Sequence, residues 1–452
     1  MKQTNFTEDT ITAIASGIGG SVAVLRISGK EALTISQHIW IGKKNLVDYP
    51  LRSLQLGNLY AKDHTLIDRC LAVYMKAPFS YTGEDVVEFQ CHGGSVVAKN
   101  ILKVILESGA RHAEPGEFSK RAFINGKIDL TQAEAVADLI AAQSDMAMHT
   151  ANRQLQGNLG SRINQCYERL TEILGEIEVR MDFVDEDLDW SSDDSINIEI
   201  TKAQELCAEL LQFRNEGEIL RNGIRLVIAG ATNAGKSSLL NLILGIDRAI
   251  VTNVPGTTRD TLEEYAHIRG IPIKLIDTAG IREATDLVEK EGIARSYGSM
   301  KEADLILWVI DSSRTLDEQQ IDLDNIDTKK IIAVVNKIDI ANNEFDLGDI
   351  SNVRISAVTG DGYTELLDCI EEKVWGHPHK EEPDVAINSR HAVLLDECAE
   401  QLAQAKQAIP NGEFELLAIN ISSAINALGK ITGRTLQDDV MDYIFAKFCI
   451  GK

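Results

Sequence analysis

The segment Gly230-Ala-Thr-Asn-Ala-Gly-Lys-Ser237 has the glycine, lysine and serine spacing of a phosphate-binding P-loop. Its glycines permit a tight turn whose backbone N–H groups can point at phosphate oxygens. We expect Lys236 to reach the β- and γ-phosphates as a catalytic residue, and the Ser237 hydroxyl to bind Mg²⁺. The sequence therefore predicts a nucleoside triphosphate site.

Three motifs further along the chain indicate which base is bound. Asp277-Thr-Ala-Gly280 would place a carboxylate near Mg²⁺ and a glycine N–H near the γ-phosphate. Asn336-Lys-Ile-Asp339 offers the Asp339 carboxylate to N1–H and the exocyclic amine of guanine, two donors that adenine does not present together. Ser356-Ala357 would supply a last contact to the base. The order and spacing of the motifs predict GTP as the substrate.

The stretch from Thr252 to Asp260 has the composition of a switch I loop, with Thr258 as a second hydroxyl on Mg²⁺. The predicted magnesium ligands are Ser237, Thr258 and, through water, Asp277. The predicted GTP-binding residues are Asn233, Ala234, Gly235, Lys236, Ser237, Ser238, Thr252, Asn253, Val254, Pro255, Gly256, Thr257, Thr258, Asp277, Thr278, Ala279, Gly280, Asn336, Lys337, Asp339, Ser356 and Ala357.

The predicted hydrolytic machinery departs from that of small GTPases resembling Ras. In those proteins a glutamine directly after the Asp-x-x-Gly motif orients the attacking water, whereas Ile281 stands here and cannot hydrogen-bond. Glu289, nine residues beyond Gly280, is the candidate replacement, although its spacing alone favours a surface residue of a charged stretch. The Asn233 amide could join loop carbonyls around a monovalent cation that stabilises charge in the transition state.

Strands and helices must position these motifs. The run RLVIA before the P-loop reads as a buried strand and SSLLNLILG after it as a helix, whose positive dipole end would face the phosphates. The strand-like runs PIKLI, IIAVV and VRI precede the other three motifs. Alternating strand and helix signals predict a parallel α/β sheet of the Ras-like, P-loop type.

The rest of the chain predicts two further domains, one α+β and one helical. Residues 1–121 mix short β-rich runs with one helix, which indicates an α+β domain. Apolar residues recur at helical spacing around 155–177, a second helical pattern covers roughly 197–218, and a third lies beyond residue 390. Since neither helical segment can bury its apolar stripe alone, we predict one discontinuous helical domain. The expected domains are 1–121 (α+β), 122–220 (helical, first part), 221–376 (G domain) and 377–452 (helical, second part).

Composition limits the partners and the compartment. The chain has 452 residues and a formal net charge of −24, so any contact with RNA must be local or shared with a more basic partner. Seven scattered cysteines without a CxxC pair argue against a disulfide framework or a zinc site and favour a reducing cytoplasm. No signal peptide and no apolar run of roughly 20 residues is found, which argues against a membrane. The acidic stretch 182–194 is more typical of a solvated linker than of a metal site.

Longer motifs resemble known families. GATNAGKSSLLN, VPGTTRD, DTAGIRE and NKID resemble the translation-factor-like GTPases that potassium activates. SYTGEDVVEFQCHGG, AEPGEFSKRAFINGKIDLTQAEAVADLI and the terminal FAKFCIGK closely resemble the tRNA modification GTPase family known as MnmE or TrmE. The second resemblance extends over essentially the whole chain.

The resemblance implies a function beyond GTP hydrolysis. Members have an N-terminal folate-binding domain that dimerises, a helical domain and an inserted G domain. With a flavoprotein of the MnmG or GidA family, in a heterotetramer, they add an aminomethyl or carboxymethylaminomethyl group at C5 of the wobble uridine of certain tRNAs. The one-carbon unit comes from a tetrahydrofolate derivative, either 5-formyl or 5,10-methylene.

The resemblance also implies roles for individual residues. It makes Glu289 the residue that orients water and Arg282 a further catalytic residue of switch II. It points to Cys449 as a cysteine of possible functional importance, although this residue could simply pack near the folate site. The potassium ligands would be Asn233, Thr252, Val254 and Thr257, and the folate-binding residues Arg26, Glu88, Lys127 and Lys452.

Two other functions are compatible with a G domain. One is an RNA- or ribosome-associated regulatory GTPase switch without modification chemistry, because a G domain does not specify the downstream function. The other is a folate-dependent transferase that acts alone. The absence of a GxGxxG motif from the sequence argues against the latter, since the redox step would then have no flavin or NAD site.

Overall fold

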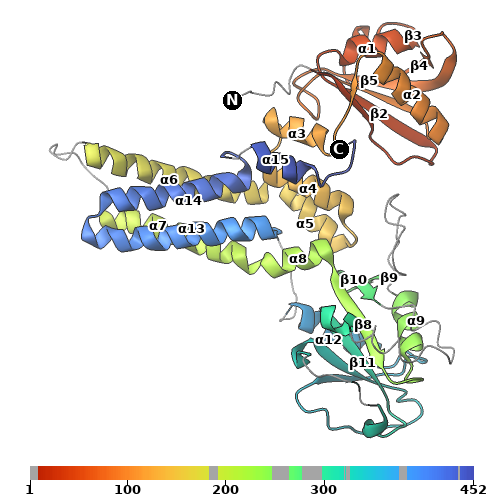
Figure 1. Ribbon diagram of the computed structural model, residues 1–452, viewed down its shortest axis with the longest axis vertical. Coiled ribbons are helices and arrows are strands. Elements are labelled where there is room, and N and C mark those ends of the chain that lie inside the picture. Colours follow the sequence, from red (N-terminus) through yellow and green to blue (C-terminus); the bar gives the residue numbers. More distant parts are fainter. Residues whose placement is uncertain are drawn as a thin grey trace. The chain divides into compact units, whose positions relative to one another are not determined.

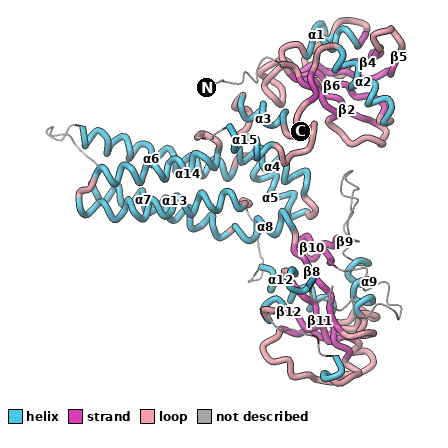
Figure 2. Tube along the Cα trace, in the orientation of Figure 1, coloured by secondary structure: helices cyan, strands magenta, loops and turns pink. Residues whose placement is uncertain are grey.

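The computed structural model describes residues 9–182, 192–246, 264–276, 298–319, 321, 326–375, 384–435 and 438–451 (Figures 1 and 2). The acidic stretch predicted as a linker lies outside the described residues from 183 to 191. The chain forms two compact units. One contains Met1–Ala137, Gly160–Thr171 and Ile425–Lys452, and the other contains Asp138–Leu159 and Glu172–Ala424.

The N-terminal part of the first unit is a seven-stranded sheet in the order β3-β4-β5-β6-β2-β1-β7. Its neighbouring strands are antiparallel except for the parallel pair β1 and β7. Buried and less buried positions alternate along β6, as expected where one face of a sheet lies on a core. The strands are β1 (Ile11–Ile14), β2 (Val22–Ser28), β3 (Trp40–Gly42), β4 (Gln55–Tyr60), β5 (Leu66–Met75), β6 (Val86–His92) and β7 (Arg111–His112).

Two helices pack on this sheet and complete its hydrophobic core, α1 (Ala32–Ile39) and α2 (Ser95–Glu107). The sequence runs that predicted strands and one helix in this region correspond to β2, β5, β6 and α2, so the predicted α+β character is confirmed. After β7 the chain continues into α3 (Glu117–Ile124) and α4 (Leu130–Ala141). Residues of α4 share a core with α15 (Asp438–Phe445) near the C-terminus.

Long helices form much of the rest of the chain. In the second unit α7 packs along α13, although the two are far apart in sequence. Their buried positions include Ile200 and Cys207 on α7 and Leu395 and Leu402 on α13. The helices are α5 (Asp145–Leu155), α6 (Asn158–Asp182), α7 (Asp193–Gln212), α8 (Arg214–Asn222), α13 (Ser389–Ala408) and α14 (Phe414–Thr432). Within the described ranges, none of the helices combines the length and apolarity needed to cross a membrane.

The predicted helix over 197–218 is in fact two helices. Helix α7 starts at the cap residue Ser192, whose side chain accepts a hydrogen bond from the Ser195 N–H, and it ends at Gln212. Helix α8 follows after Phe213. At Gly217 a Cβ atom would lie 2.6 Å from the Ile387 carbonyl oxygen, so this glycine permits a close approach of backbone that the apolar periodicity does not reveal.

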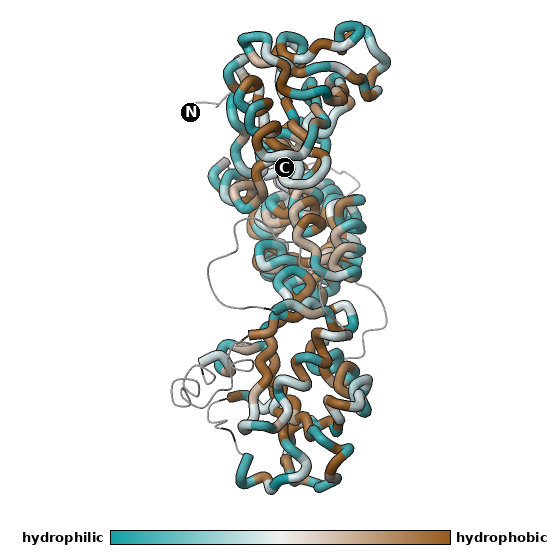
Figure 3. The backbone as a smooth tube through the Cα atoms, turned by 90° about the vertical axis from the view of Figure 1, so that its right-hand side faces the viewer, coloured by the Kyte–Doolittle hydropathy of each residue, from teal (hydrophilic) through white to brown (hydrophobic). Residues whose placement is uncertain are grey.

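The second unit contains a six-stranded sheet in the order β13-β12-β11-β8-β10-β9, in which β9 alone is antiparallel to its neighbour. Every residue of β11 and β12 is buried, as expected for strands covered on both faces. Brown, hydrophobic stretches recur along the tube in Figure 3. The parallel α/β sheet predicted from the sequence is confirmed. Its elements are β8 (Ile224–Gly230), α9 (Lys236–Ile246), β9 (Glu264–Ile268), β10 (Ile271–Ile276), β11 (Leu305–Asp311), β12 (Ile331–Asn336), β13 (Ser351–Arg354) and α12 (Tyr363–Trp375).

Candidate functional site

The P-loop connects β8 to α9, and its backbone requires the residue types found there. Gly230 and Gly235 have φ angles of +145° and +101°. A Cβ atom would lie 2.3 Å from the Val309 carbonyl oxygen at the first position and 2.1 Å from the Asn336 side-chain nitrogen at the second. Asn233 has a φ of +64°, a left-handed conformation that asparagine tolerates better than most residues. The loop is therefore both tightly turned and tightly packed.

Lys236 lies over this loop. Its Nζ donates hydrogen bonds to the carbonyl oxygens of Gly230 and Ala231, each at 2.8 Å. Burial of the side chain lowers the pKa of Lys236, because the charged form loses contact with water. A bound phosphate would favour the charged form again. The lysine is thus held beside the loop amides, where a nucleotide phosphate is expected.

Asn336 connects three of the predicted motifs. It ends β12, and its side chain is almost completely buried. Its Nδ2 donates to the Ala234 carbonyl oxygen at 3.0 Å, and its Oδ1 accepts from the Ala357 N–H at 3.0 Å. The P-loop, the Asn-Lys-Ile-Asp motif and the Ser-Ala motif are therefore brought together through one amide, as the sequence predicts for a guanine-nucleotide site.

Lys337 makes a second connection. Its φ angle is +67°, and its Nζ donates to the Asn233 carbonyl oxygen at 2.8 Å and to Asp311 Oδ2 at 2.6 Å. Asp339 follows in the same turn and is exposed, as expected of a carboxylate that receives a base. Ser356 is buried, and its Oγ accepts from the Thr359 N–H at 3.2 Å, which fixes the loop that is expected to make the last base contact.

The remaining predicted residues of the G domain divide into two groups. Ser237 and Ser238 lie in the first turn of α9 and are exposed, whereas Ala234 is buried. The second group lies outside the described residues, together with Ile281 and the terminal Lys452. It comprises Thr252, Asn253, Val254, Pro255, Gly256, Thr257, Thr258, Asp277, Thr278, Ala279, Gly280, Arg282 and Glu289.

Asp311 belongs to this site but to none of the predicted motifs. It is the last residue of β11 and is 1% exposed. Burial acts to raise the pKa of its carboxyl group, but hydrogen bonds from Lys337 and Ser313 outweigh burial and lower the pKa below the ordinary value of 3.8. Asp311 is thus a buried anion at the edge of the sheet where the Asn-Lys-Ile-Asp motif begins. The one sequence signal for it is an acidic residue that ends the apolar strand LILWVID.

The predicted folate-binding residues Arg26 and Glu88 form a pair. They are direct neighbours across the antiparallel strands β2 and β6, and Arg26 Nε lies 2.7 Å from Glu88 Oε1. The Arg26 guanidinium carbon lies 5.6 Å from the centroid of the Tyr81 ring and 5.4 Å from that of Phe118. Both charged side chains are partly exposed, at 19% and 17%. The arrangement offers a donor, an acceptor and two aromatic rings within one small region.

Lys127 and Cys449 lie in the same unit. Lys127 is exposed, and its Nζ donates to the Pro78 carbonyl oxygen at 3.0 Å. Cys449 is also exposed, and its backbone oxygen accepts a hydrogen bond from the Gly116 N–H at 3.3 Å. The following residue, Ile450, forms a β-bridge with Pro115. These backbone bonds attach the C-terminal segment to the start of α3.

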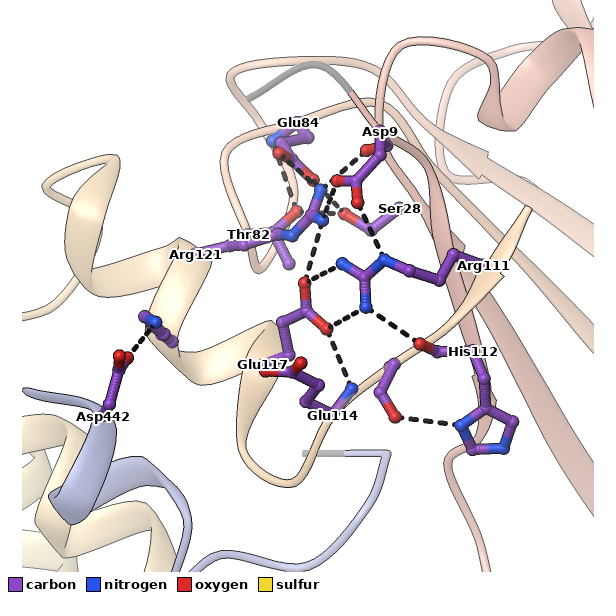
Figure 4. A network of polar contacts seen from close by, with 12 residues as sticks. Asp9, Ser28, Thr82, Glu84, Arg111, His112, Glu114, Glu117, Arg121 and Asp442 are labelled. Atoms are coloured by element: carbon purple, nitrogen blue, oxygen red, sulfur yellow. Dashed lines mark hydrogen bonds and ion pairs between the residues drawn. The ribbon is translucent and has the colours of Figure 1, made fainter. Parts of the chain in front are cut away.

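A network of buried charges holds α3 against the N-terminal sheet (Figure 4). Arg121 and Glu117, both on α3, are 2% exposed each. Arg121 donates to Glu117 at 3.0 Å and to Asp9 at 2.6 Å, and it also contacts Glu84 at 3.1 Å. Arg111 donates to Glu117 at 2.7 Å. Since each buried charge has several partners of opposite sign, loss of one partner is costly.

This network predicts loss of stability in acid. Burial acts to raise the pKa of Glu117, but hydrogen bonds from Arg111, the Glu114 backbone and Arg121 lower the pKa below the ordinary 4.5. A carboxylate with a lowered pKa contributes stability that is complete above the ordinary value and lost as pH falls through the lowered one. We expect Glu117→Gln to reduce the hydrogen-exchange protection of α3 amides at neutral pH. The difference from the unmodified protein should shrink as pH falls below 4.5.

The matched control is Glu31→Gln, which alters an exposed carboxylate of the same domain. It should leave the protection of α3 unchanged at every pH. An effect of Glu117→Gln that is the same at all pH values would contradict a contribution from the ionised carboxylate.

Both the N-terminal domain and the rest of the chain match known proteins. Residues 10–127 match the family model of the GTP-binding protein TrmE N-terminus, and residues 130–449 match that of the MnmE helical domain. The tRNA modification GTPase MnmE of Clostridioides difficile (strain 630) is 42% identical over 459 residues, covering 99% of this chain and 100% of the relative. That of Geobacter sulfurreducens is 42% identical over 456 residues, with the same coverage. The solved G domain of the T. maritima FeoB iron transporter is 31% identical, covering 34% of this chain and 99% of that one, with a TM-score of 0.23.

The family models together cover both flanks of the nucleotide site, and the relatives match the chain over its whole length. The residues that join the P-loop to the guanine-binding loops agree with the activity that those relatives are named for. The family that the sequence motifs suggested is thereby confirmed. The chain belongs to the MnmE (TrmE) family of tRNA modification GTPases.

Proposed function

We propose that this GTPase acts with a flavoprotein of the MnmG or GidA family at C5 of the wobble uridine of certain tRNAs. The pair would install an aminomethyl or carboxymethylaminomethyl group there. Its one-carbon unit would come from a tetrahydrofolate derivative, in the 5-formyl or 5,10-methylene form. The observation that supports this most strongly is 42% identity to tRNA modification GTPases over 99% of the chain. The GTP cycle would drive conformational change during the modification.

The Arg26–Glu88 pair supports a folate site in the N-terminal domain. The Glu88 carboxylate can accept hydrogen bonds from a pterin ring, and arginine suits the carboxylates of the folate glutamate tail. The rings of Tyr81 and Phe118 near Arg26 suit a planar ligand. Lys127 and Lys452 would add positive charge for the same tail. The residues present thus fit the chemistry of a folate, which when bound would supply the one-carbon unit.

Partners follow from the charge of the chain. A formal net charge of −24 gives the protein no general attraction for tRNA, so a more basic partner would share the tRNA contacts. We infer a homodimer, formed through the N-terminal domain, that joins the flavoprotein in a heterotetramer. We place the complex in the cytoplasm.

Nucleoside analysis tests the proposed function. Mass spectrometry of tRNA from cells that lack the protein should show wobble uridines without the aminomethyl and carboxymethylaminomethyl groups. The intact gene should restore them. The gene for Arg26→Gln should not restore the modification, although the purified Arg26→Gln protein should still hydrolyse GTP. Fully modified tRNA in the deletion strain would instead favour a regulatory GTPase switch that binds RNA or ribosomes. Reconstitution with flavoprotein, GTP, potassium, folate and tRNA then tests sufficiency.

We also propose the ions that serve the G domain. Ser237, Thr258 and Asp277, the last through water, would hold Mg²⁺, and Asn233, Thr252, Val254 and Thr257 would hold K⁺. Glu289 would orient the attacking water in place of the aliphatic Ile281, with Arg282 as a further catalytic residue. Asn233 suits its role, because its side chain is exposed while Lys337 fixes its backbone carbonyl. When bound, the cations would offset negative charge on the phosphates.

This assignment predicts a dependence on potassium. GTP hydrolysis should be at least about tenfold faster in KCl than in NaCl at equal ionic strength, because a correctly sized ion adds charge stabilisation in the transition state. Asn233→Ala should remove the difference by lowering the rate in KCl. Thr232→Ala, which changes an exposed neighbour in the same loop, should retain the difference. Equal rates of the unmodified protein in the two salts would overturn the potassium assignment.

A further inference from the structure

Every backbone carbonyl of the P-loop from Gly230 to Ala234 accepts a hydrogen bond from a side chain. A peptide group is planar, with its C=O and N–H pointing in opposite directions, so a fixed carbonyl also fixes the N–H of the next residue. The donors are Lys236 to the oxygens of Gly230 and Ala231 (2.8 Å each), Arg314 to Thr232 (3.4 Å), Lys337 to Asn233 (2.8 Å) and Asn336 to Ala234 (3.0 Å).

Two of these donors converge on Asp311. Lys337 Nζ lies 2.6 Å from Asp311 Oδ2, and Arg314 Nε lies 3.7 Å from the same oxygen. The sheet places the carboxylate there, because Asp311 on β11 is the register partner of Asn336 on β12 and Lys337 follows directly. Arg314 lies outside the nucleotide-binding motifs, as Asp311 does. One buried anion thus holds two cations that each reach a carbonyl of the P-loop.

Asp311 is itself fixed in place. Its Oδ1 accepts from the N–H of Ser313 at 2.9 Å and from its hydroxyl at 2.6 Å. Its backbone N–H donates to the Gln319 side-chain oxygen at 2.6 Å, and its backbone oxygen accepts from the Gln319 amide at 2.9 Å. Asp311 and Gln319 are each 1% exposed. The carboxylate therefore has one oxygen bound by its own turn and the other directed to the cations.

We propose that Asp311 is a positioning residue for the nucleotide phosphates. It holds Lys337 and Arg314 on the Asn233 and Thr232 carbonyls, and so fixes two consecutive peptide groups of the P-loop. The Asn233 carbonyl keeps the loop in its tight turn, in which the Ala234 N–H donates to the Ala231 carbonyl oxygen at 3.2 Å. The Thr232 carbonyl sets the direction of the Asn233 N–H toward the diphosphate of a guanine nucleotide. Arg314 acts with Asp311 as a second positioning residue. This positioning role concerns the GTP site and does not depend on the tRNA chemistry.

The alternative for the same carboxylate is a role at the base. Lys337 also belongs to the guanine-binding motif, so Asp311 could shape the base pocket instead of the phosphate loop. Inosine diphosphate distinguishes the two, because it keeps the phosphates of GDP but lacks the exocyclic amine that Asp339 is expected to bind. A phosphate role weakens both nucleotides equally, whereas a base role changes the preference for GDP over IDP.

The test is the affinity of full-length Asp311→Asn for GDP and IDP, measured by isothermal titration calorimetry. Asparagine keeps the shape but removes the charge that holds two cations, so the Kd for GDP should rise about 10- to 100-fold. The ratio of the two Kd values should stay unchanged. Arg314→Gln should raise the Kd for GDP about threefold, because its contacts are longer and more exposed. Asp349→Asn, an exposed carboxylate of the same domain, should have no effect.

The double variant adds a readout that general destabilisation would not give. If Arg314 acts through Asp311, the effects of Asp311→Asn and Arg314→Gln should not add. Unchanged GDP affinity in a folded Asp311→Asn protein overturns the proposal, and so does a loss confined to the preference for GDP over IDP. If Asp311→Asn does not fold, Arg314→Gln and Arg314→Lys decide. Weaker GDP binding by Arg314→Gln that Arg314→Lys recovers supports the positioning role. Unchanged GDP affinity of Arg314→Gln overturns it.

Discussion

Replacing Asp339 with asparagine is expected to change the base preference of the site from guanine to xanthine. The Asp339 carboxylate is expected to accept from two donors of guanine, whereas an asparagine amide would donate one of its hydrogens where xanthine presents a carbonyl oxygen. The affinity for GDP should fall about 1000-fold, since the exocyclic amine of guanine would face the asparagine NH2 group, which is also a donor, instead of a carboxylate oxygen. The affinity for xanthosine diphosphate should rise correspondingly. Calorimetric titration of both nucleotides with the variant and the unmodified protein measures this change.

The structure explains why a substitution at one exposed position should act so selectively. Asp339 follows a strand end that Asn336 fixes to the P-loop and to Ala357, so the backbone of the pocket does not depend on the Asp339 side chain. Asp346→Asn, an exposed aspartate of the same domain, is the matched control and should keep the guanine preference. A ratio of GDP to xanthosine diphosphate affinity that is the same in Asp339→Asn and the unmodified protein would refute the assignment.

Replacing Lys236 with alanine is expected to lower the rate of GTP hydrolysis about 1000-fold. The ammonium group lies within hydrogen-bond distance of two P-loop carbonyls, beside the amides that are expected to meet the phosphates. It can therefore stabilise the negative charge that develops between the β- and γ-phosphates. Such charge-assisted contacts contribute strongly in the transition state. Single-turnover phosphate release at saturating GTP measures this effect separately from nucleotide binding.

Lys301→Ala is the control for Lys236→Ala. Lys301 is an exposed lysine of the same domain, and its loss should leave the rate within a factor of two or so. Hydrolysis by Lys236→Ala at more than a tenth of the normal rate would show that this lysine does not stabilise the transition state.

Local patterns in the sequence predicted much of the fold. The apolar runs before each nucleotide motif are the strands β8, β10, β12 and β13, and the run after the P-loop is α9. These elements could be predicted because strand and helix periodicities are properties of consecutive residues. Phe213 shows the limit of this approach, since the break there between α7 and α8 coincides with no loss of apolar periodicity.

The nucleotide site was predictable to the extent that its residues form contiguous motifs. Asn336 and Lys337 were assigned to the guanine loop from their spacing, and the structure adds that both also bond to P-loop carbonyls. The same spacing could not identify Asp311, because an aspartate at a strand end is common. Its role depends on β11 lying beside β12 with Asp311 opposite Asn336, which is a matter of strand order and register.

The N-terminal site shows the same division. The sequence by itself determined that Arg26 and Glu88 belong to strand-forming runs, and the family motifs singled out both residues. Only the tertiary structure decided that they face each other, because residues 26 and 88 become neighbours through the antiparallel register of β2 and β6. Local propensity selects the elements, but pairing between distant charges depends on which strands adjoin and at which residue, and long-range packing fixes that choice.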